Sequence, residues 1–221
     1  MNRKLSLTIG IVLFVLGVAL IFNKQIMGFI VSHMSNQAIE QFDEQKAQNA
    51  DDVSFDFGKV ENISLQDVLK AQMNQGDVHS IGALSVPDVS LQLPILYGIS
   101  NTNLAIGAGT LKKDMKMGQG NYALAGHNMN NDKTLFSPLT KAKKGMLMYT
   151  TDYKRVYTYK ITKIFITEAT DVQVIENQAK KRLLTLVTCN YDGSKRLIVQ
   201  GEYVNARDFD SNAGDAFTIK K

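Results

Sequence analysis

The chain has 221 residues, 44% of them hydrophobic and 21% charged, which allows one domain with appendages or two small domains and excludes both a large multidomain enzyme and wholesale disorder. The formal net charge of +4 falls to +1 when Arg3, Lys4 and Lys24 are set aside, because the remaining 22 basic residues face 21 acidic ones. Such a balanced domain lacks the basic surface that neutralises a phosphate backbone, which argues against nucleic acid as a partner.

An apolar stretch stands near the N-terminus. Residues 5–22 read LSLTIGIVLFVLGVALIF, eighteen uncharged residues, about the minimum that crosses a hydrocarbon core as a helix. Arg3 and Lys4 precede it, and the positive-inside rule then carries the rest of the chain across the membrane. We predict a single-pass anchor with the main domain outside. The alternative is a cleaved signal peptide, since Gly17 and Ala19 have a usable spacing, but the apolar run continues past that site.

The segment after the apolar stretch is polar. Residues 35–52 are low in β-branched types, which is typical of a solvated helix or a loose stalk. Ser64 and Asp67 then resemble a capping box, and the apolar spacing up to Gly76 predicts a short helix. The predicted organisation is a cytoplasmic N-terminus at 1–4, a membrane anchor at 5–22, a stalk or linker at 23–54 and the main domain at 55–221.

Short runs rich in Val, Ile, Leu, Tyr and Thr follow, separated by turn residues. Because few helical stretches interrupt them, the domain is predicted to be mainly β, a closed or nearly closed barrel. Neither a G-x-G-x-x-G nor a P-loop string occurs, so no motif supports nucleotide binding. The predicted strands are 82–86, 90–97, 122–127, 146–151, 155–167, 182–191 and 196–203.

The one cysteine of the chain lies beside a predicted hairpin. A lone cysteine excludes an intramolecular disulfide, and with three histidines it excludes a cysteine-rich zinc module. Asp192 and Gly193 are a strong two-residue hairpin signal, and that register pairs Cys189 with Arg196, at a Cβ separation of about 5 Å. The neighbouring guanidinium would favour the reactive thiolate and could stabilise an oxyanion.

A histidine would complete a catalytic set. His33 and His79 have nothing reactive around them in the sequence, whereas His127 ends a predicted strand and enters a polar loop, where functional groups are often placed. Cys189, His127 and Arg196 together would support nucleophilic catalysis at a carbonyl. Spacing alone favours the plainer alternative of a small core cysteine with a surface histidine and arginine. Neither the papain order nor the caspase string fits.

Three sequence features together resemble the sortases of Gram-positive bacteria: LAGH at 124–127, TLVTC at 185–189 and Arg196. The resemblance covers roughly residues 55–209. It implies an eight-stranded β-barrel and a cysteine transpeptidase that cleaves an LPxTG-type sorting signal between Thr and Gly through a thioester. The acceptor it implies is an amino group of lipid II, the peptidoglycan precursor. The N-terminal apolar stretch and the lack of an Asp-Pro-aromatic lid resemble class A, the housekeeping type, rather than the pilus-building type.

The same resemblance implies roles for individual residues. Cys189 matches the nucleophile, His127 the general acid and base, and Arg196 the group that holds substrate and stabilises the oxyanion. Thr188 is implied to assist substrate or oxyanion binding. Ala125 and Val187 match positions that line the sorting-signal groove, although both are equally ordinary core residues.

The loop before the histidine strand departs from the calcium-binding members of class A. Residues 112–118 read KKDMKMG, in which Asp114 stands among three lysines. A hard dication needs several oxygen ligands, so we expect no metal, no calcium requirement and no other cofactor. Two alternatives to a transpeptidase stay open at this point: a non-catalytic, membrane-tethered β domain that binds cell-wall polymer or a protein, and a cysteine endopeptidase that uses water as the acceptor.

Overall fold

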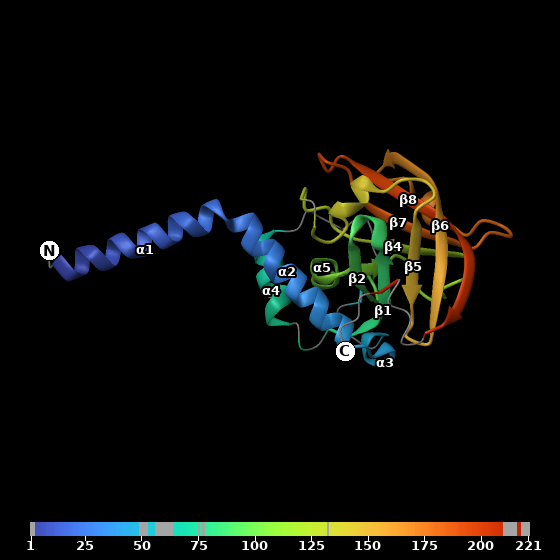
Figure 1. Ribbon diagram of the computed structural model, residues 1–221, viewed down its shortest axis with the longest axis horizontal. Helices are drawn as coiled ribbons and strands as arrows, with labels where there is room; N and C mark the ends of the chain where they lie inside the picture. Colours follow the sequence, from blue (N-terminus) through green and yellow to red (C-terminus); the bar gives the residue numbers. More distant parts are fainter. Residues whose placement is uncertain are drawn as a thin grey trace.

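The computed structural model describes residues 3–48, 53–55, 64–74, 76, 78–131, 133–209 and 216–217. Within these residues eight strands form a closed barrel in the order β1-β2-β3-β4-β7-β8-β6-β5 (Figure 1). The predicted mainly β barrel is therefore confirmed, with the strand number that the family resemblance implied. The strands are β1 (Ser80–Val86), β2 (Leu91–Leu96), β3 (Ala108–Thr110), β4 (Asn121–Ala125), β5 (Leu147–Thr151), β6 (Arg155–Glu168), β7 (Leu183–Cys189) and β8 (Lys195–Asp208).

Two of the strand pairs are parallel, β2 with β3 and β4 with β7, and the others are antiparallel. The sequence prediction missed β3 and the preceding helix α5 (Asn101–Ile106). β3 is three residues long and wholly buried, so it shows no alternation of polar and apolar residues. Its pairing with β2, Ile95 beside Ala108, lines up residues that lie on either side of α5.

Alternation along β4 separates two apolar clusters. Tyr122 and Leu124 belong to the large cluster that fills the barrel, whereas Ala123 and Ala125 belong to a second, smaller cluster. Because successive side chains of a strand point to opposite faces, the second cluster lies on the outer face of the barrel wall. Val187 of β7 is in this outer cluster. The outer face of β4 and β7 is thus small and apolar.

Helices gather on one side of the barrel. Figure 1 shows α1 (Arg3–Ile21) extending away from the domain, while α2 (Asn23–Glu40) lies against it. Among the described residues no single helix is both long and apolar enough to cross a membrane. One pair of helical segments meets both conditions together, Leu7–Val18 with Asn23–Glu40, and this pair is bent by 70°. The anchor at 5–22 stays a prediction. The remaining helices are α3 (Glu44–Gln48), α4 (Leu65–Met73) and the 3-10 turns η3 (Pro87–Val89), η4 (Ser137–Lys141) and η5 (Val172–Ile175).

The predicted capping box at the start of α4 is present. The Asp67 backbone N–H donates to Ser64 Oγ at 3.2 Å, and the Ser64 N–H donates to the Asp67 carboxylate at 2.8 Å. These bonds satisfy donors that have no partner within the helix. The local sequence signal was therefore sufficient to place this helix.

The segment between residues 35 and 52 was predicted to be a solvated helix or a loose stalk; its first part is helical, as one alternative had it, but it is packed against the barrel. α2 buries Met34 and Ala38 completely in the main core, and the Ser35 hydroxyl donates to the backbone carbonyl of Ile106 in α5. The apolar positions that begin this face precede residue 35, so the polar composition of the later segment hid the pattern. The packed body consequently extends upstream of residue 55, the predicted start of the main domain.

A matched pair of methionine substitutions tests the packing of α2. Met34→Ala should lower the free energy of unfolding by about 2 to 5 kcal/mol, because it removes a wholly buried side chain and leaves a cavity. Met73→Ala in α4, where the side chain is 87% exposed, should change it by less than about 0.5 kcal/mol. Urea denaturation of the full chain in mild detergent measures both. Equal effects would mean that α2 does not pack on the barrel.

Candidate active site

Cys189 and Arg196 stand opposite each other at the ends of β7 and β8, as the hairpin register predicted. The turn between the strands differs from the prediction. The Gly193 N–H donates to the Asn190 carbonyl at 3.1 Å, which places Tyr191 and the following aspartate at the centre of the turn. Gly193 follows in the left-handed region with φ of 78°, a conformation that glycine adopts at little cost. The predicted register is therefore confirmed, but the connection spans residues 191–194 and is not the predicted two-residue loop of Asp192 and Gly193.

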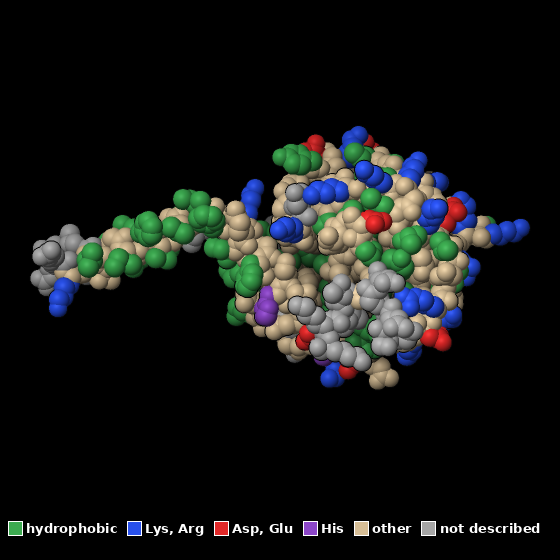
Figure 2. All heavy atoms as spheres, in the orientation of Figure 1, with side chains coloured by type: hydrophobic (Ala, Val, Ile, Leu, Met, Phe, Trp, Pro, Cys, Tyr) green, Lys and Arg blue, Asp and Glu red, His purple; other side chains and the backbone are tan. Residues whose placement is uncertain are grey.

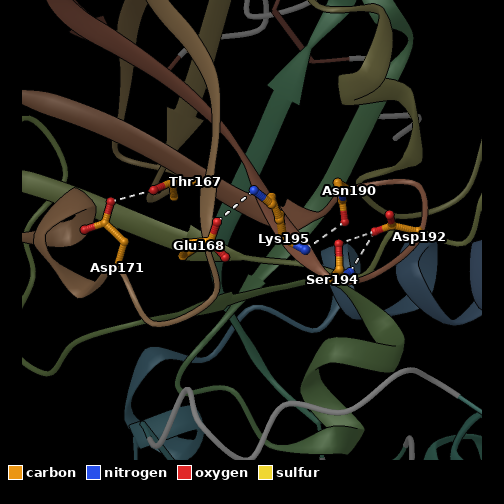
Figure 3. Close-up of polar contacts among 7 residues, drawn as sticks. All are labelled: Thr167, Glu168, Asp171, Asn190, Asp192, Ser194 and Lys195. Carbon is orange, nitrogen blue, oxygen red and sulfur yellow. Dashed lines mark hydrogen bonds and ion pairs between the residues drawn. The ribbon is translucent and has the colours of Figure 1, made fainter.

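Polar contacts hold this hairpin in one shape (Figure 3). Ser194 donates to Asp192 Oδ1 through its backbone N–H at 2.8 Å and its hydroxyl at 2.6 Å. The Lys195 N–H donates to Asn190 Oδ1 at 3.0 Å. The Lys195 ammonium also pairs with Glu168 at the end of β6 at 2.7 Å, although an exposed pair of this kind contributes little to stability. The contacts within the turn fix the strand ends that carry the cysteine and the arginine.

His127 follows β4 through Gly126 and is only 5% exposed. The Gly126 N–H donates to the Val187 carbonyl at 3.2 Å, which continues the pairing of β4 with β7. A Cβ atom at Gly126 would lie 2.8 Å from Cγ of the buried Phe136 ring, so this approach requires glycine. The Thr188 hydroxyl donates to the Gly126 carbonyl at 2.7 Å. These contacts tie the residue before the histidine to the strand that carries the cysteine.

Two asparagines that the sequence analysis did not single out join the histidine loop to the hairpin. The Asn128 side-chain amide donates to the Cys189 carbonyl at 3.1 Å, and the Asn130 amide donates to the Tyr191 carbonyl at 3.0 Å. The polarity of the loop after His127 was noticed, but nothing in the sequence names the carbonyl groups that these amides reach. The loop and the hairpin therefore form one connected unit.

One small pocket brings together all six residues that were predicted for the site. It is also lined by Leu104 of α5, which sequence reasoning missed because α5 itself was missed. A larger cavity of about 320 Å³ lies at the end of the barrel where β4 begins, and the described residues that line it include neither the cysteine nor the histidine. The chemistry therefore belongs to the smaller pocket. Its predicted members are Cys189, His127, Arg196, Thr188, Ala125 and Val187.

An apolar pocket adjoins the cysteine pocket. The two share Val187 and Arg196, so they are neighbours on the outer face of the barrel. η5 and its neighbours in the β6–β7 loop form one wall of the apolar pocket, and Ile198 of β8 belongs to its floor. Together the two pockets offer a reactive end beside an apolar recess.

Side chains from the β3–β4 region hold the wall formed by η5. The Lys112 ammonium donates to the Ile175 carbonyl at 2.7 Å, and the Asn121 amide donates to the Val174 carbonyl at 3.0 Å. The Asn121 backbone N–H also donates to Asn177 Oδ1 at 2.9 Å. Partial burial lowers the pKa of Lys112, and Glu176 opposes that shift. The wall is thus bound through two backbone carbonyls and the side chain of Asn177.

The electrostatics of the pocket favour a neutral imidazole beside a permanent cation. Burial lowers the pKa of His127 to about 4, and the carboxylate of Asp67 partly opposes this shift. The imidazole is therefore neutral at pH 7 and able to accept a proton. The Arg196 guanidinium, which stays charged in proteins, donates to the carbonyls of Gly193 and Lys195 at 3.3 and 3.2 Å.

This arrangement can carry out nucleophilic chemistry at a carbonyl. It supplies a thiol, a base that can take the thiol proton and a cation that can stabilise a developing oxyanion. Across the described part of the chain no three His, Cys, Asp or Glu side chains are grouped so that they could hold a metal ion. The residues present therefore point to acyl transfer through the thiol.

Comparisons with known proteins agree with this chemistry. A sortase domain model matches residues 84–204, the range that contains His127, Cys189 and Arg196. Sortase A of Streptococcus agalactiae is 40% identical over 214 residues, which cover 90% of this chain and 84% of that protein. Sortase A of Listeria monocytogenes is 37% identical over 203 residues, covering 90% and 91%. The solved structure of the Listeria monocytogenes sortase A matches with a TM-score of 0.61 at 35% identity, covering 64% of this chain and 99% of that one.

The buried histidine makes the stability of the domain depend on pH. Its pKa is about 4 in the folded state and 6.5 when unperturbed, so protons bind the unfolded chain more tightly. The stability that the neutral His127 contributes is fully present above pH 6.5, the pKa in the unfolded chain. It is lost as the pH falls from there toward the folded-state pKa of about 4. Between pH 7 and pH 4 the free energy of unfolding should drop by about 3 kcal/mol because of His127.

Urea denaturation at several pH values measures this dependence. The carboxylates of the chain add their own pH dependence, so the relevant quantity is the difference between the wild type and His127→Asn, which keeps a polar side chain but does not titrate. A difference that stays constant from pH 7 to pH 4 would contradict the low pKa.

Proposed function

The chain belongs to the sortase family, and we propose that its pocket cleaves LPxTG-type sorting signals and transfers the released protein to an amino group of the cell-wall precursor lipid II. It is a cysteine transpeptidase of the sortase A type, which anchors surface proteins to the cell wall. The observation that carries the proposal is the single pocket that contains Cys189, His127 and Arg196.

The proposed reaction has two halves. In the first, Cys189 Sγ attacks the carbonyl carbon of the signal threonine while His127 accepts the thiol proton, and Arg196 stabilises the oxyanion. His127 then gives this proton to the departing glycine amine, which leaves a thioester on Cys189. In the second half the acceptor amine attacks the thioester, His127 takes a proton from that amine, and the thiol is restored when the amide forms.

The apolar pocket suits the residues that precede the cleaved bond. Its wall and floor are formed by Val172, Val174, Ile175 and Ile198, and it shares Val187 with the cysteine pocket. A leucine and a proline carry no charge and gain free energy from apolar burial. We therefore assign the Leu-Pro part of the signal to this recess, with the threonine carbonyl at Cys189.

We also propose that residues 5–22 anchor the protein in the membrane, with the N-terminus in the cytoplasm and the catalytic domain outside the cell membrane. α1 exposes large apolar side chains around its whole circumference, among them Leu13, Phe14 and Leu20. A helix that is apolar all round is stable when something apolar covers it. Arg3 and Lys4 set the orientation. This placement brings the pocket to a lipid-linked acceptor.

No calcium requirement is expected for this activity. Asp114 is accompanied by three lysines in its loop, and the ammonium of Lys112 joins this loop region to Ile175 of the β6–β7 loop. A fixed positive charge disfavours a hard dication at the same place. Enzyme treated with a chelator should therefore gain less than about twofold in activity when calcium is restored. A large gain would overturn the expectation.

Mass analysis of the reaction products tests the proposed function. The full chain in mild detergent is incubated with an LPxTG-containing peptide and a small primary amine, and the wild type should yield the amide of the threonine. Cys189→Ala should lower its formation by roughly a thousandfold or more, since it removes the thiol, and the hydroxyl of Thr188, which also lines the pocket, donates to the Gly126 carbonyl. Equal urea midpoints for both proteins control for folding. An acid in place of the amide would indicate an endopeptidase, and product formation by Cys189→Ala would contradict the assigned nucleophile.

The bond from Lys112 to the β6–β7 loop should influence substrate binding more than chemistry. Lys112→Met removes the ammonium that holds the Ile175 carbonyl, so the apolar wall loosens. We expect KM for the peptide to rise by roughly threefold to tenfold with little change in kcat, as for the loss of the hydrogen bonds that this charged group donates to the Ile175 carbonyl and to Asn177 Oδ1. Lys116→Met, an exposed lysine of the same loop, is the matched control. A fall in kcat alone would contradict this role.

A further inference from the structure

α2 carries apolar side chains on two faces, and the barrel covers only one of them. Met34 and Ala38 are buried in the main core. On the other side Ile26 and Phe29, together with Phe22 at the N-cap of α2, are 44%, 76% and 49% exposed. Their spacing of four and three residues places them in one stripe along the start of the helix. Exposed phenylalanines at neighbouring positions of one helix face need an explanation.

The polarity of this face changes along the helix. After Phe29 the same stripe continues with His33, Asn36 and Glu40, which are exposed as well. The apolar part is thus confined to the first two turns, next to α1. Lys24 lies among these turns, and no Asp or Glu occurs in the sequence before Glu40. A gradient from apolar and basic to polar and acidic fits a helix that leaves an anionic lipid surface.

The apolar surface of α2 is continuous with that of α1. Figure 2 shows hydrophobic side chains along α1 that continue onto the adjoining side of the domain. α4, which packs against α2, exposes Leu69 and Met73, four residues apart on its own surface. Two adjacent helices of the domain therefore both expose apolar side chains.

We propose that the first two turns of α2 lie in the interfacial layer of the membrane, with Phe22, Ile26 and Phe29 in contact with lipid. This inference rests on the proposed anchor, because the apolar helix that ends at Ile21 would deliver the stripe to the bilayer surface. Helices that lie in the interface insert an apolar face below the headgroups and place basic residues at the headgroup level. Lys24 supplies a positive charge within the same two turns, although the helical spacing places it on the side opposite the stripe.

The packing of α2 gives this contact a consequence for the active site. The Ser35 hydroxyl donates to the Ile106 carbonyl at the end of α5, and Leu104 of α5 lines the cysteine pocket. Packed contacts therefore connect α2 through α5 to the pocket. They would hold the pocket at a fixed height above the bilayer, as an acceptor amine carried on a lipid requires.

The chain contains no tryptophan, so a single introduced indole reports on one site. Phe29→Trp places it in the stripe. Phe165→Trp is the matched control, because Phe165 is also exposed, at 37%, and belongs to β6 on the side of the barrel away from α1 (Figure 1). Full-length protein is reconstituted into vesicles of phosphatidylcholine and phosphatidylglycerol whose acyl chains carry bromine either near the headgroup or near the methyl end.

Bromine near the headgroup should reduce the indole emission of the Phe29→Trp protein by roughly twofold, while bromine near the methyl end has less effect and the Phe165→Trp protein responds to neither. Co-flotation of the protein with the vesicles tests the anchor separately. A protein that does not float would refute the anchor, and with it the interfacial contact that rests on it.

The remaining outcomes concern the interfacial contact alone. If the Phe29→Trp protein floats and neither bromine changes its emission, the anchor stands and the interfacial contact is refuted, as it would be for a stripe that pairs with a second copy. Stronger quenching from the methyl end would place residue 29 inside a membrane span and also refute the proposal.

Discussion

The parallel pairing of β4 with β7 is the constraint on which the active site depends. Parallel strands end at the same edge of a sheet, so the histidine that follows β4 and the cysteine that ends β7 must lie close together. Ala125 stands beside Val187, and the Gly126 N–H continues the ladder by one more bond. The Thr188 hydroxyl and the Asn128 amide then reach across the same junction. The pairing of β4 with β7 brings the histidine and the cysteine together, and the remaining contacts of the pocket hold them there.

Within the pocket, His127 is distinguished by its burial and Arg196 by its charge. His127 is enclosed by the barrel wall and the loop that follows it, and this enclosure keeps its imidazole neutral at physiological pH. Arg196 lies on the more open side, where its charge is tolerated and where the two pockets meet. The base is thus the more buried of the two groups, and the cation is the one that the two pockets share. This arrangement suits a proton that shuttles within the pocket and an oxyanion that forms on the incoming peptide.

Sequence reasoning reached the parts of this structure that depend on local signals. The hairpin placed Arg196 opposite Cys189, and the capping box placed α4. The meeting of His127 and Cys189 could not be derived in this way, because it depends on a parallel pairing between strands about sixty residues apart, and only the family resemblance supplied it. β3 is too short to show a period, and the contacts of α2 depend on which of its two apolar faces meets the barrel. Tertiary pairing decided each of these cases.

Closure of the barrel determines how such a protein can read an extended polypeptide. Each of the eight described strands has a neighbour on both sides, so an incoming chain finds no long free edge to which it could add as a further strand. Strand addition would accept almost any sequence, because it uses backbone groups that all peptides share. Recognition must instead pass through side-chain recesses on the outer wall. Because the closed sheet offers no free edge for backbone pairing, binding depends on the side chains of the peptide, and a short motif can be selected.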